Sequence, residues 1–274
     1  MSKRVRHILN LSGGKDSTAL AIYLRDRIPD LEYVFYDTEK ELPETYDYLD
    51  LVEAYLGKKV IRLRHDGRGF DHWLAVYRGY LPSTRMRWCT KHLKIRPFEH
   101  FAGDDNVVTY IGIRADEDRT GYLSSRPNIR ARYPFKEDGI TKQDVLRILK
   151  ESGLGMPSYY QWRSRSGCYF CFFQQKIEWV GLLEKHPNYY LMAQSYEKLL
   201  PNGTRYTWNG DESLEELSRP ERIAEIKAEH ERRMALESKR QHNRSLMEVA
   251  LDNDTFASVI EGYQLDDPCI ECSV

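Results

Sequence analysis

A loop rich in glycine and hydroxyl groups follows the first apolar stretch of the chain. Residues 5–11 are typical of a buried strand and residues 18–27 of a helix, and between them stands the sequence Ser12-Gly13-Gly14-Lys15-Asp16-Ser17. Glycines let backbone N–H groups approach an anion, and a helix N-terminus carries partial positive charge. The pattern therefore predicts a phosphate-binding loop within a strand–loop–helix unit of an open α/β sheet.

The rest of the first half of the chain also alternates between predicted strands and helices. Apolar runs at 33–36, 60–63 and 107–113 predict further strands, and residues 43–56 predict a helix. Alternating strands and helices predict an α/β fold, a doubly wound and mostly parallel sheet, with ligands at the carboxyl ends of the strands. We expect a nucleotide-binding domain over residues 1–160.

Residues 161–274 have a different character. A loop rich in arginine, cysteine and aromatic residues spans 161–173, helices are expected at 176–200, and a long charged helix at 220–244. We interpret this part as a helical, cysteine-containing extension with a flexible tail. The charged helix would be solvated by default, although it could also dock a partner or a second copy of the chain.

Charge and hydropathy limit the functional classes. The chain of 274 residues has 41 lysines and arginines against 42 acidic residues, a net charge of -1, so any contact with nucleic acid must come from local basic patches. No apolar run is long enough to span a membrane, and no signal-peptide core follows the basic N-terminus. We expect a cytoplasmic protein without a membrane partner.

Within the loop, each side chain suits a triphosphate. Lys15 adds a full positive charge, Ser12 and Ser17 add hydroxyl donors, and Asp16 is a candidate ligand for Mg²⁺. The spacing differs from the Walker loop, which needs four residues between its glycines. A glycine turn without a ligand is the alternative interpretation.

Other residues at predicted strand ends are candidates for adenosine binding. Asp37 and Thr38 follow the second strand, and Gly112 and Arg114 follow the strand over 107–113. Asp37 could instead cap the next helix. Arg114, together with Arg119, is also a candidate contact for an acceptor phosphate; ion pairs with neighbouring acidic residues are the alternative.

Five cysteines argue for metal, cluster or thiol chemistry in a reducing compartment. They comprise two CxxC pairs and one isolated residue: Cys168 and Cys171, Cys269 and Cys272, and Cys89. An iron–sulfur cluster, a structural zinc ion held by both pairs, and free thiols with the tail as a persulfide carrier remain open. We expect the flanking Arg163 and Arg165 to lower the pKa of the Cys168 thiol.

Several segments together resemble the PP-loop ATP pyrophosphatases of the phosphoadenosine-phosphosulfate (PAPS) reductase-like family. They are the loop itself, Asp37-Thr38-Glu39 with Pro43-Glu44-Thr45, residues 88–97, residues 110–117, and Ser166-Gly167-Cys168-Tyr169-Phe170-Cys171. The later segments resemble most closely the sulfur-activating subunit of bacterial DNA phosphorothioation systems. The resemblance covers roughly residues 5–175 and implies the adenine nucleotide α-hydrolase-like fold.

The resemblance also implies an activity. ATP would be cleaved to AMP and pyrophosphate with Lys15 and Asp16 in catalysis, activating an acceptor oxygen, a DNA backbone phosphate, for sulfur insertion. A cysteine desulfurase would supply sulfur, and DNA or a DNA-bound complex would be the acceptor. A [4Fe–4S] cluster would use Cys89, Cys168 and Cys171, with Cys269, Cys272 or a non-protein group as its fourth ligand.

Two other functional classes remain open. Cluster-bearing assimilatory reductases show two adjacent cysteines where this chain has only Cys89, yet Glu271-Cys272 resembles the nucleophilic tail of PAPS reductases. A sulfonucleotide reductase would use Cys272 as its catalytic thiol. A zinc-stabilised adaptor would bind a nucleotide or nucleic acid without catalysis.

Overall fold

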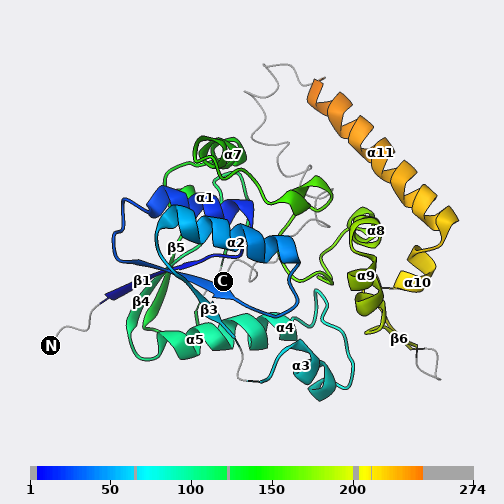
Figure 1. Cartoon of the computed structure of the whole chain (residues 1–274), viewed down its shortest axis with the longest axis horizontal. Helices are drawn as coiled ribbons and strands as arrows, with labels where there is room; N and C mark the ends of the chain where they lie inside the picture. The colour runs from blue at the N-terminus through cyan, green and yellow to red at the C-terminus, as the bar shows by residue number, and fades with distance from the viewer. Residues whose placement is uncertain (1–4, 65–66, 122–123, 200–203, 211, 243–274) are drawn as a thin grey trace. The chain divides into compact units, whose positions relative to one another are not determined.

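The computed structural model describes residues 5–64, 67–121, 124–199, 204–210 and 212–242 (Figure 1). The chain divides into two compact units, and the change falls between Phe172 and Phe173. Each unit is described by itself below. The domain boundary expected near residue 160 stays a prediction, and the expected tail with Cys269 and Cys272 lies outside the described residues.

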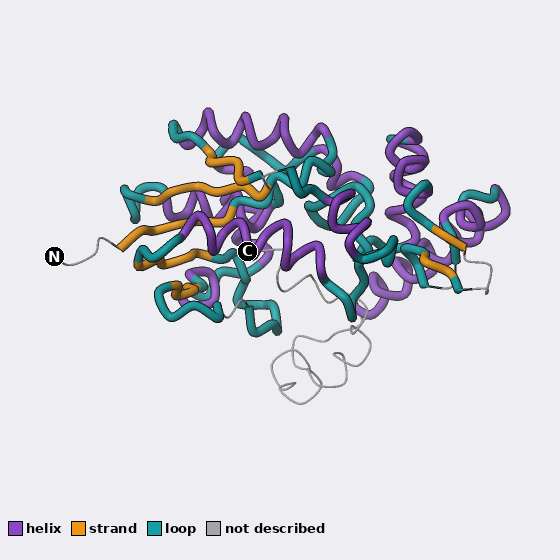
Figure 2. The backbone as a smooth tube through the Cα atoms, turned by 90° about the horizontal axis from the view of Figure 1, so that it is seen from below, coloured by secondary structure: helices purple, strands orange, loops and turns teal. Residues whose placement is uncertain are grey.

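A five-stranded parallel sheet forms the centre of the first unit, with the strand order β3-β2-β1-β4-β5. Neighbouring strands lie side by side in Figure 2. The strands are β1 (Val5–Asn10), β2 (Leu31–Tyr36), β3 (Val60–Leu63), β4 (Asn106–Tyr110) and β5 (Ile129–Arg132). All four pairings are parallel. The order reverses between β1 and β4, the place where open α/β sheets bind their ligands. This arrangement confirms the predicted doubly wound α/β fold.

Successive residues of the inner strands pack on opposite faces of the sheet. Leu9 and Tyr33 join one apolar cluster with residues of α1, α2 and α7, whereas Ile8 and Val34 join a second cluster with Phe98 of α5. The bounds are α1 (Lys15–Leu24), α2 (Pro43–Leu56), α5 (Arg96–Ala102) and α7 (Lys142–Glu151). Because these strands are covered on both faces, few of their positions can be polar. This explains why they are near-continuous apolar runs in the sequence.

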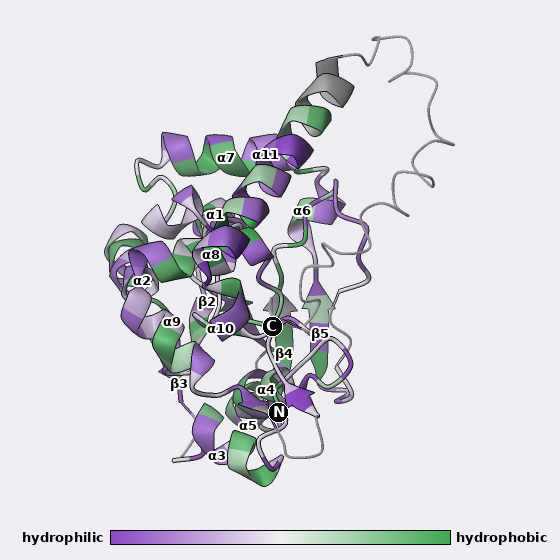
Figure 3. Ribbon diagram, turned by 90° about the vertical axis from the view of Figure 1, so that its right-hand side faces the viewer, coloured by the Kyte–Doolittle hydropathy of each residue, from purple (hydrophilic) through white to green (hydrophobic). Residues whose placement is uncertain are grey.

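Local signals explain where these helices begin and end. Helix α2 begins at Pro43, whose missing N–H costs nothing at a first turn, and ends at Gly57 in the left-handed conformation. Helix α7 begins with a reciprocal capping box between Thr141 and Asp144. Figure 3 shows hydrophilic and hydrophobic residues alternating along α7, and Val145 is among those that it buries.

Further short elements complete the first unit. They are α3 (Phe70–Val76), α4 (Trp88–Thr90), a π-helical turn (Lys91–Ile95), α6 (Pro134–Glu137) and a 3₁₀ turn (Ser158–Gln161). Strand β4 ends at Tyr110, so residues 111–113, which were predicted as strand, form a loop. That loop starts at the switch point and leads to Arg114.

The second unit is mainly helical. Its elements are α8 (Lys176–Lys185), α9 (Pro187–Gln194), β6 (Lys198–Leu199), β7 (Arg205–Tyr206), α10 (Leu214–Leu217) and α11 (Pro220–His242). The helices expected over 176–200 are thus two, divided at His186 and Pro187, and a short antiparallel strand pair follows them. Trp179, Tyr190 and Trp208 are buried together. Among the described residues no helix combines the length and apolar character needed to cross a bilayer.

Candidate phosphate and cysteine site

The predicted phosphate loop lies between β1 and α1, at the carboxyl edge of the sheet. Gly13 has φ +72°, a conformation that favours glycine, and a Cβ there would lie 2.9 Å from Thr45 Cγ2. Helix α1 begins at Lys15 without a side-chain cap. Its first turn therefore presents the positive end of the helix dipole and a lysine at the place where an anion is expected.

Hydroxyl groups hold the loop closed on itself. The backbone N–H of Ser12 donates to Ser17 Oγ at 3.1 Å, and the two serine hydroxyls lie 3.0 Å apart. Ser17 Oγ also donates to the carbonyl of Gly14 at 3.2 Å. The loop is thus shaped by hydrogen bonds among its own residues.

The loop after β4 meets the phosphate loop at the carboxyl edge of the sheet. Gly112 and Arg114, the candidates for adenosine binding, belong to this loop, and that role stays a prediction. A Cβ on Gly112 would lie 3.0 Å from the carbonyl oxygen of Asp16, so only glycine allows the two backbones to come this close. Arg114 Nη1 lies 2.8 Å from Asp16 Oδ1, and Lys15 Nζ lies 3.1 Å from Asp16 Oδ2. Asp16 is therefore held between two cations. Its expected role as a Mg²⁺ ligand stays a prediction.

Arg114 and Arg119 also contact the acidic residues near them. Arg114 lies 2.9 Å from Asp116 and 2.6 Å from Glu117, and Arg119 lies 2.7 Å from the same Glu117. Neighbouring carboxylates raise the pKa of Arg114, although burial opposes them. Both arginines thus form the ion pairs considered as the alternative, and contact with an acceptor phosphate stays a prediction.

Asp37 lies at the end of β2 with its carboxylate buried. Tyr46 donates to Oδ1 at 2.7 Å, the N–H of Glu39 donates to the same oxygen at 3.0 Å, and Arg64 Nε donates to Oδ2 at 2.8 Å. Three donors engage a side chain that is only 1% exposed. Asp37 organises the turn after β2, and its expected contact with adenosine stays a prediction.

Three residues of the segment 159–166 approach the phosphate loop. The sequence did not single out Tyr159 and Tyr160, and it named Ser166 only as part of the resemblance. Tyr159 donates to the carbonyl of Gly13 at 2.9 Å, and the N–H of Lys15 donates to Tyr160 Oη at 3.1 Å. Ser166 Oγ donates to Ser12 Oγ at 3.2 Å. These contacts join residues more than 140 positions apart, so no local sequence pattern predicts them.

Cys89, Cys168 and Cys171 line one small cavity in the first unit. The other lining residues are Thr38, Phe70, Pro82, Thr90, Leu93, Lys94, Gly167, Phe170 and Phe172. All three thiols are free and partly buried. The structure thus brings together the three cysteines that the resemblance assigned to one cluster, and it adds Thr38, which was expected at the nucleotide.

Burial favours the thiol form of Cys89 and, together with a neighbouring carboxylate, that of Cys168. Burial raises the pKa of Cys89 to about 11. Burial and then the nearby Glu41 raise the pKa of Cys168 well above its usual value. The expectation that Arg163 and Arg165 lower this pKa is wrong, because burial and Glu41 outweigh the cations nearby. The guanidinium of Arg163 donates to the carbonyls of Gly167 and Cys168.

A single metal ion and an iron–sulfur cluster require different spacings of their thiol ligands. Sulfurs on one zinc ion lie about 3.8 Å apart, as follows from Zn–S bonds of about 2.3 Å in a tetrahedron. In the described part of the chain no three cysteine, histidine or acidic side chains are grouped closely enough to hold one metal ion. In a cluster, each of three thiols that line one cavity would ligate a different iron atom, and the expected cluster stays a prediction.

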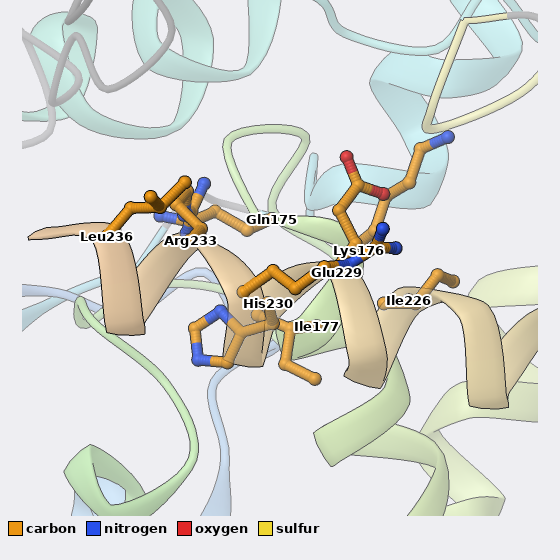
Figure 4. A pocket seen from close by; sticks show the side chains of 9 residues that line it. Gln175, Lys176, Ile177, Ile226, Glu229, His230, Arg233 and Leu236 are labelled. Atoms are coloured by element: carbon orange, nitrogen blue, oxygen red, sulfur yellow. The ribbon is translucent and has the colours of Figure 1, made fainter.

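The second unit has a hollow of its own, an open groove of about 590 Å³ between α8 and α11 (Figure 4). Ile177 and Ile226 form its apolar part, while Lys176 and Glu229 carry opposite charges. Lys176 is paired with Glu212 at 2.7 Å, and Arg233 donates to Gln175 at 2.6 Å. Its charges are of mixed sign, as expected of a solvated face.

Together these features define the class of the first unit: an open parallel α/β protein with a glycine loop and a cavity of thiols, the loop lying where the strand order reverses. The chain belongs to the family described as the phosphoadenosine phosphosulfate reductase domain, whose model matches residues 6–171. Members of this family are enzymes. The match covers the phosphate loop and ends at Cys171.

Relatives include proteins of known and unknown activity. The uncharacterized protein MJ0066 of Methanocaldococcus jannaschii is 29% identical over 58% of this chain, and the chain spans only 35% of that relative's length. The tRNA-specific 2-thiouridylase MnmA of Streptococcus pyogenes is 29% identical to this chain. The match covers 44% of this chain and 37% of the length of MnmA. The phosphate complex of PAPS reductase from Candida auris has a TM-score of 0.48 at 15% identity, covering 60% of this chain and 81% of that one.

Proposed function

We propose that the chain is a sulfur-transfer enzyme that cleaves ATP to AMP and pyrophosphate. One observation carries the proposal: the phosphate loop and the three-cysteine cavity belong to the same unit and are joined by a segment of three residues. Ser166 contacts Ser12 of the loop, and Cys168 lines the cavity. A site that activates an oxygen and a site that holds sulfur would therefore be neighbours along one short stretch of chain.

In the proposed first step, an acceptor oxygen attacks the α-phosphorus of ATP. The bond from that phosphorus to the bridging oxygen breaks, and pyrophosphate leaves. Lys15 and the N–H groups of the loop would stabilise the charge that develops on the pyrophosphate. Asp16 would help to hold Mg²⁺, which typically uses one or two carboxylates together with substrate phosphates.

In the second step a sulfur nucleophile displaces AMP from the activated acceptor. The sulfur would be at the level of hydrosulfide, released by a thiol reductant from a persulfide that a cysteine desulfurase supplies. Cys89, Cys168 and Cys171 would hold a [4Fe–4S] cluster, which when bound would supply an iron atom able to carry sulfur. We propose a DNA backbone phosphate as the acceptor, following the resemblance of residues 88–97 and 110–117 to the phosphorothioation subunit.

The direct test is pyrophosphate release from ATP, measured with and without duplex DNA. Lys15→Ala and Asp16→Ala should each lower the rate at least about 100-fold, because charge stabilisation in such sites is worth several kcal/mol. Lys59→Ala is the matched control, since that lysine is 91% exposed and pairs with Glu53 at the surface. An unchanged rate in the Lys15 variant would show that the loop is not the site.

A second candidate is reduction of a sulfonucleotide, which the description of the matched family favours. This reaction would release sulfite from a phosphosulfate without forming pyrophosphate, and it would require the Cys272 thiol. Incubation with PAPS and a dithiol reductant separates the two activities. Sulfite formation that is lost in Cys272→Ser would favour the reductase.

A further inference from the structure

We infer that Tyr160 and Ser166 are ligands of the pyrophosphate group, completing the phosphate loop from the opposite side. The inference rests on the proposed function, since it concerns the same loop. The loop supplies one wall, built from residues 12–17. The segment 159–166 supplies a second wall whose hydroxyl groups already lie at hydrogen-bond distance from that loop.

The first argument is steric. A Cβ on Gly14 would lie 2.7 Å from Ser166 Oγ and 3.2 Å from Tyr160 Oη. Gly14 has an extended conformation that any residue adopts, so its φ does not require glycine. The lack of a side chain at this position is explained by the two hydroxyl groups that stand over it. They are therefore part of the loop's immediate surroundings.

The second argument concerns donors. Tyr160 Oη accepts from the N–H of Lys15 at 3.1 Å, so its own proton remains to be donated. Burial raises the pKa of Tyr160 to about 12, which keeps the hydroxyl protonated at neutral pH. A phosphate oxygen seated at the Lys15 amide is then within reach of the tyrosine donor as well.

The third argument is that this wall is fixed in place. Tyr159 is buried, with 1% of its surface exposed, and donates to the carbonyl of Gly13 at 2.9 Å. Lys15 Nζ lies 5.2 Å from the centre of the Tyr160 ring, a distance at which a cation and an aromatic face attract. A site on anchored side chains loses little freedom when it binds an anion.

Calorimetric titration with pyrophosphate tests the inference. Tyr160→Phe and Ser166→Ala each remove one hydroxyl, and each should weaken pyrophosphate binding about 10-fold, the effect of a hydrogen bond to a charged group. Neither change should alter the affinity for adenosine, which has no phosphate. Tyr23→Phe is the control, because that hydroxyl donates to Asp138 on an exposed surface. Thermal melting verifies that each variant is folded.

The outcomes separate this inference from the proposed function. If Lys15→Ala abolishes pyrophosphate binding while both hydroxyl variants bind as tightly as the wild type, or more tightly, the inference is wrong and the loop remains the site. If the wild-type protein binds neither pyrophosphate nor ATP, both are wrong. Weakened binding in Lys15→Ala and in both hydroxyl variants, with Tyr23→Phe unchanged, supports the inference.

Discussion

Arg114 Nη1 lies 2.8 Å from Asp16 Oδ1, and this ion pair ties the loop after β4 to the first turn of α1. Both side chains are mostly buried, with 12% and 22% of their surfaces exposed. Partly buried pairs are screened less by water than surface pairs. The contact joins two segments almost 100 residues apart at the edge of the sheet where the strand order reverses.

We predict strong coupling between these two residues. Arg114→Gln and Asp16→Asn should each destabilise the protein in urea unfolding, and the double variant should lose less than the sum, with a coupling free energy of about 0.5–3 kcal/mol. The exposed pair Lys59–Glu53 should give a coupling close to zero. Additive effects at Arg114 and Asp16 would contradict the structural role of the pair.

Gly112 should tolerate no side chain. In Gly112→Ala the new Cβ would lie 3.0 Å from the carbonyl oxygen of Asp16 and 3.1 Å from its carbonyl carbon, and backbone cannot move aside as a flexible side chain can. We expect a loss of about 1–3 kcal/mol in unfolding free energy and weaker pyrophosphate binding. Gly69→Ala is the control, since the nearest atom, Glu39 Oε2, lies 3.7 Å from its Cβ position.

Much of the first unit could be predicted from sequence because its signals are local. The strand before the phosphate loop, the strand at 60–63 and the helix at 43–56 combine an apolar pattern with glycine or proline at their ends. Strand β5 was not predicted from the sequence, because only Ile129 of its four residues is buried and this edge strand has no continuous apolar run. Helix α3 spans only seven residues, too few for a clear periodicity.

Part of the site was also predictable, because the residues that follow each strand can be located from local sequence signals. Residues after parallel strands must meet at one edge, so Gly112 and Arg114 were expected beside the phosphate loop. Tyr160 and Ser166 were not, because they come from a loop whose path is set by tertiary contacts. The error about the pKa of Cys168 has a similar origin: sequence proximity placed Arg163 and Arg165 near the thiol, whereas burial and Glu41, which raise this pKa, follow from tertiary packing.

Tyr46 should be important for stability through Asp37. Tyr46→Phe removes the hydroxyl that donates to Asp37 Oδ1 at 2.7 Å and leaves a carboxylate that is 1% exposed with one donor fewer. We expect a loss of about 1–3 kcal/mol in the free energy of unfolding. Tyr23→Phe, which removes a hydroxyl bonded to the exposed Asp138, should change stability little. Equal effects of the two variants would argue against the importance of the buried carboxylate.

Glu216 should contribute stability that depends on pH. Its carboxylate accepts from the N–H and hydroxyl of Ser213 at the start of α10 and pairs with Arg205, and these bonds lower its pKa from 4.5 to about 2. A lowered folded-state pKa means that the contribution is complete above about pH 4.5. It is lost as the pH falls from about 4.5 towards 2.

The measurement is thermal unfolding of the wild type and Glu216→Gln between pH 2 and pH 7. The variant should melt at a lower temperature at pH 7, and the difference should shrink towards pH 2 as the wild-type carboxylate becomes protonated. Glu221→Gln, on the first turn of α11, is the control. A difference in melting temperature that stays constant across this range would show that the charge of Glu216 does not stabilise the cap.

The three-cysteine cavity makes a prediction about bound metal. Protein purified without oxygen should contain iron and acid-labile sulfide and absorb broadly in the visible range. Cys89→Ser, Cys168→Ser and Cys171→Ser should each remove most of the iron, because all three thiols line one cavity. Thr90→Val alters the same cavity without removing a sulfur, so it should retain iron. Stoichiometric zinc in place of iron would contradict the cluster.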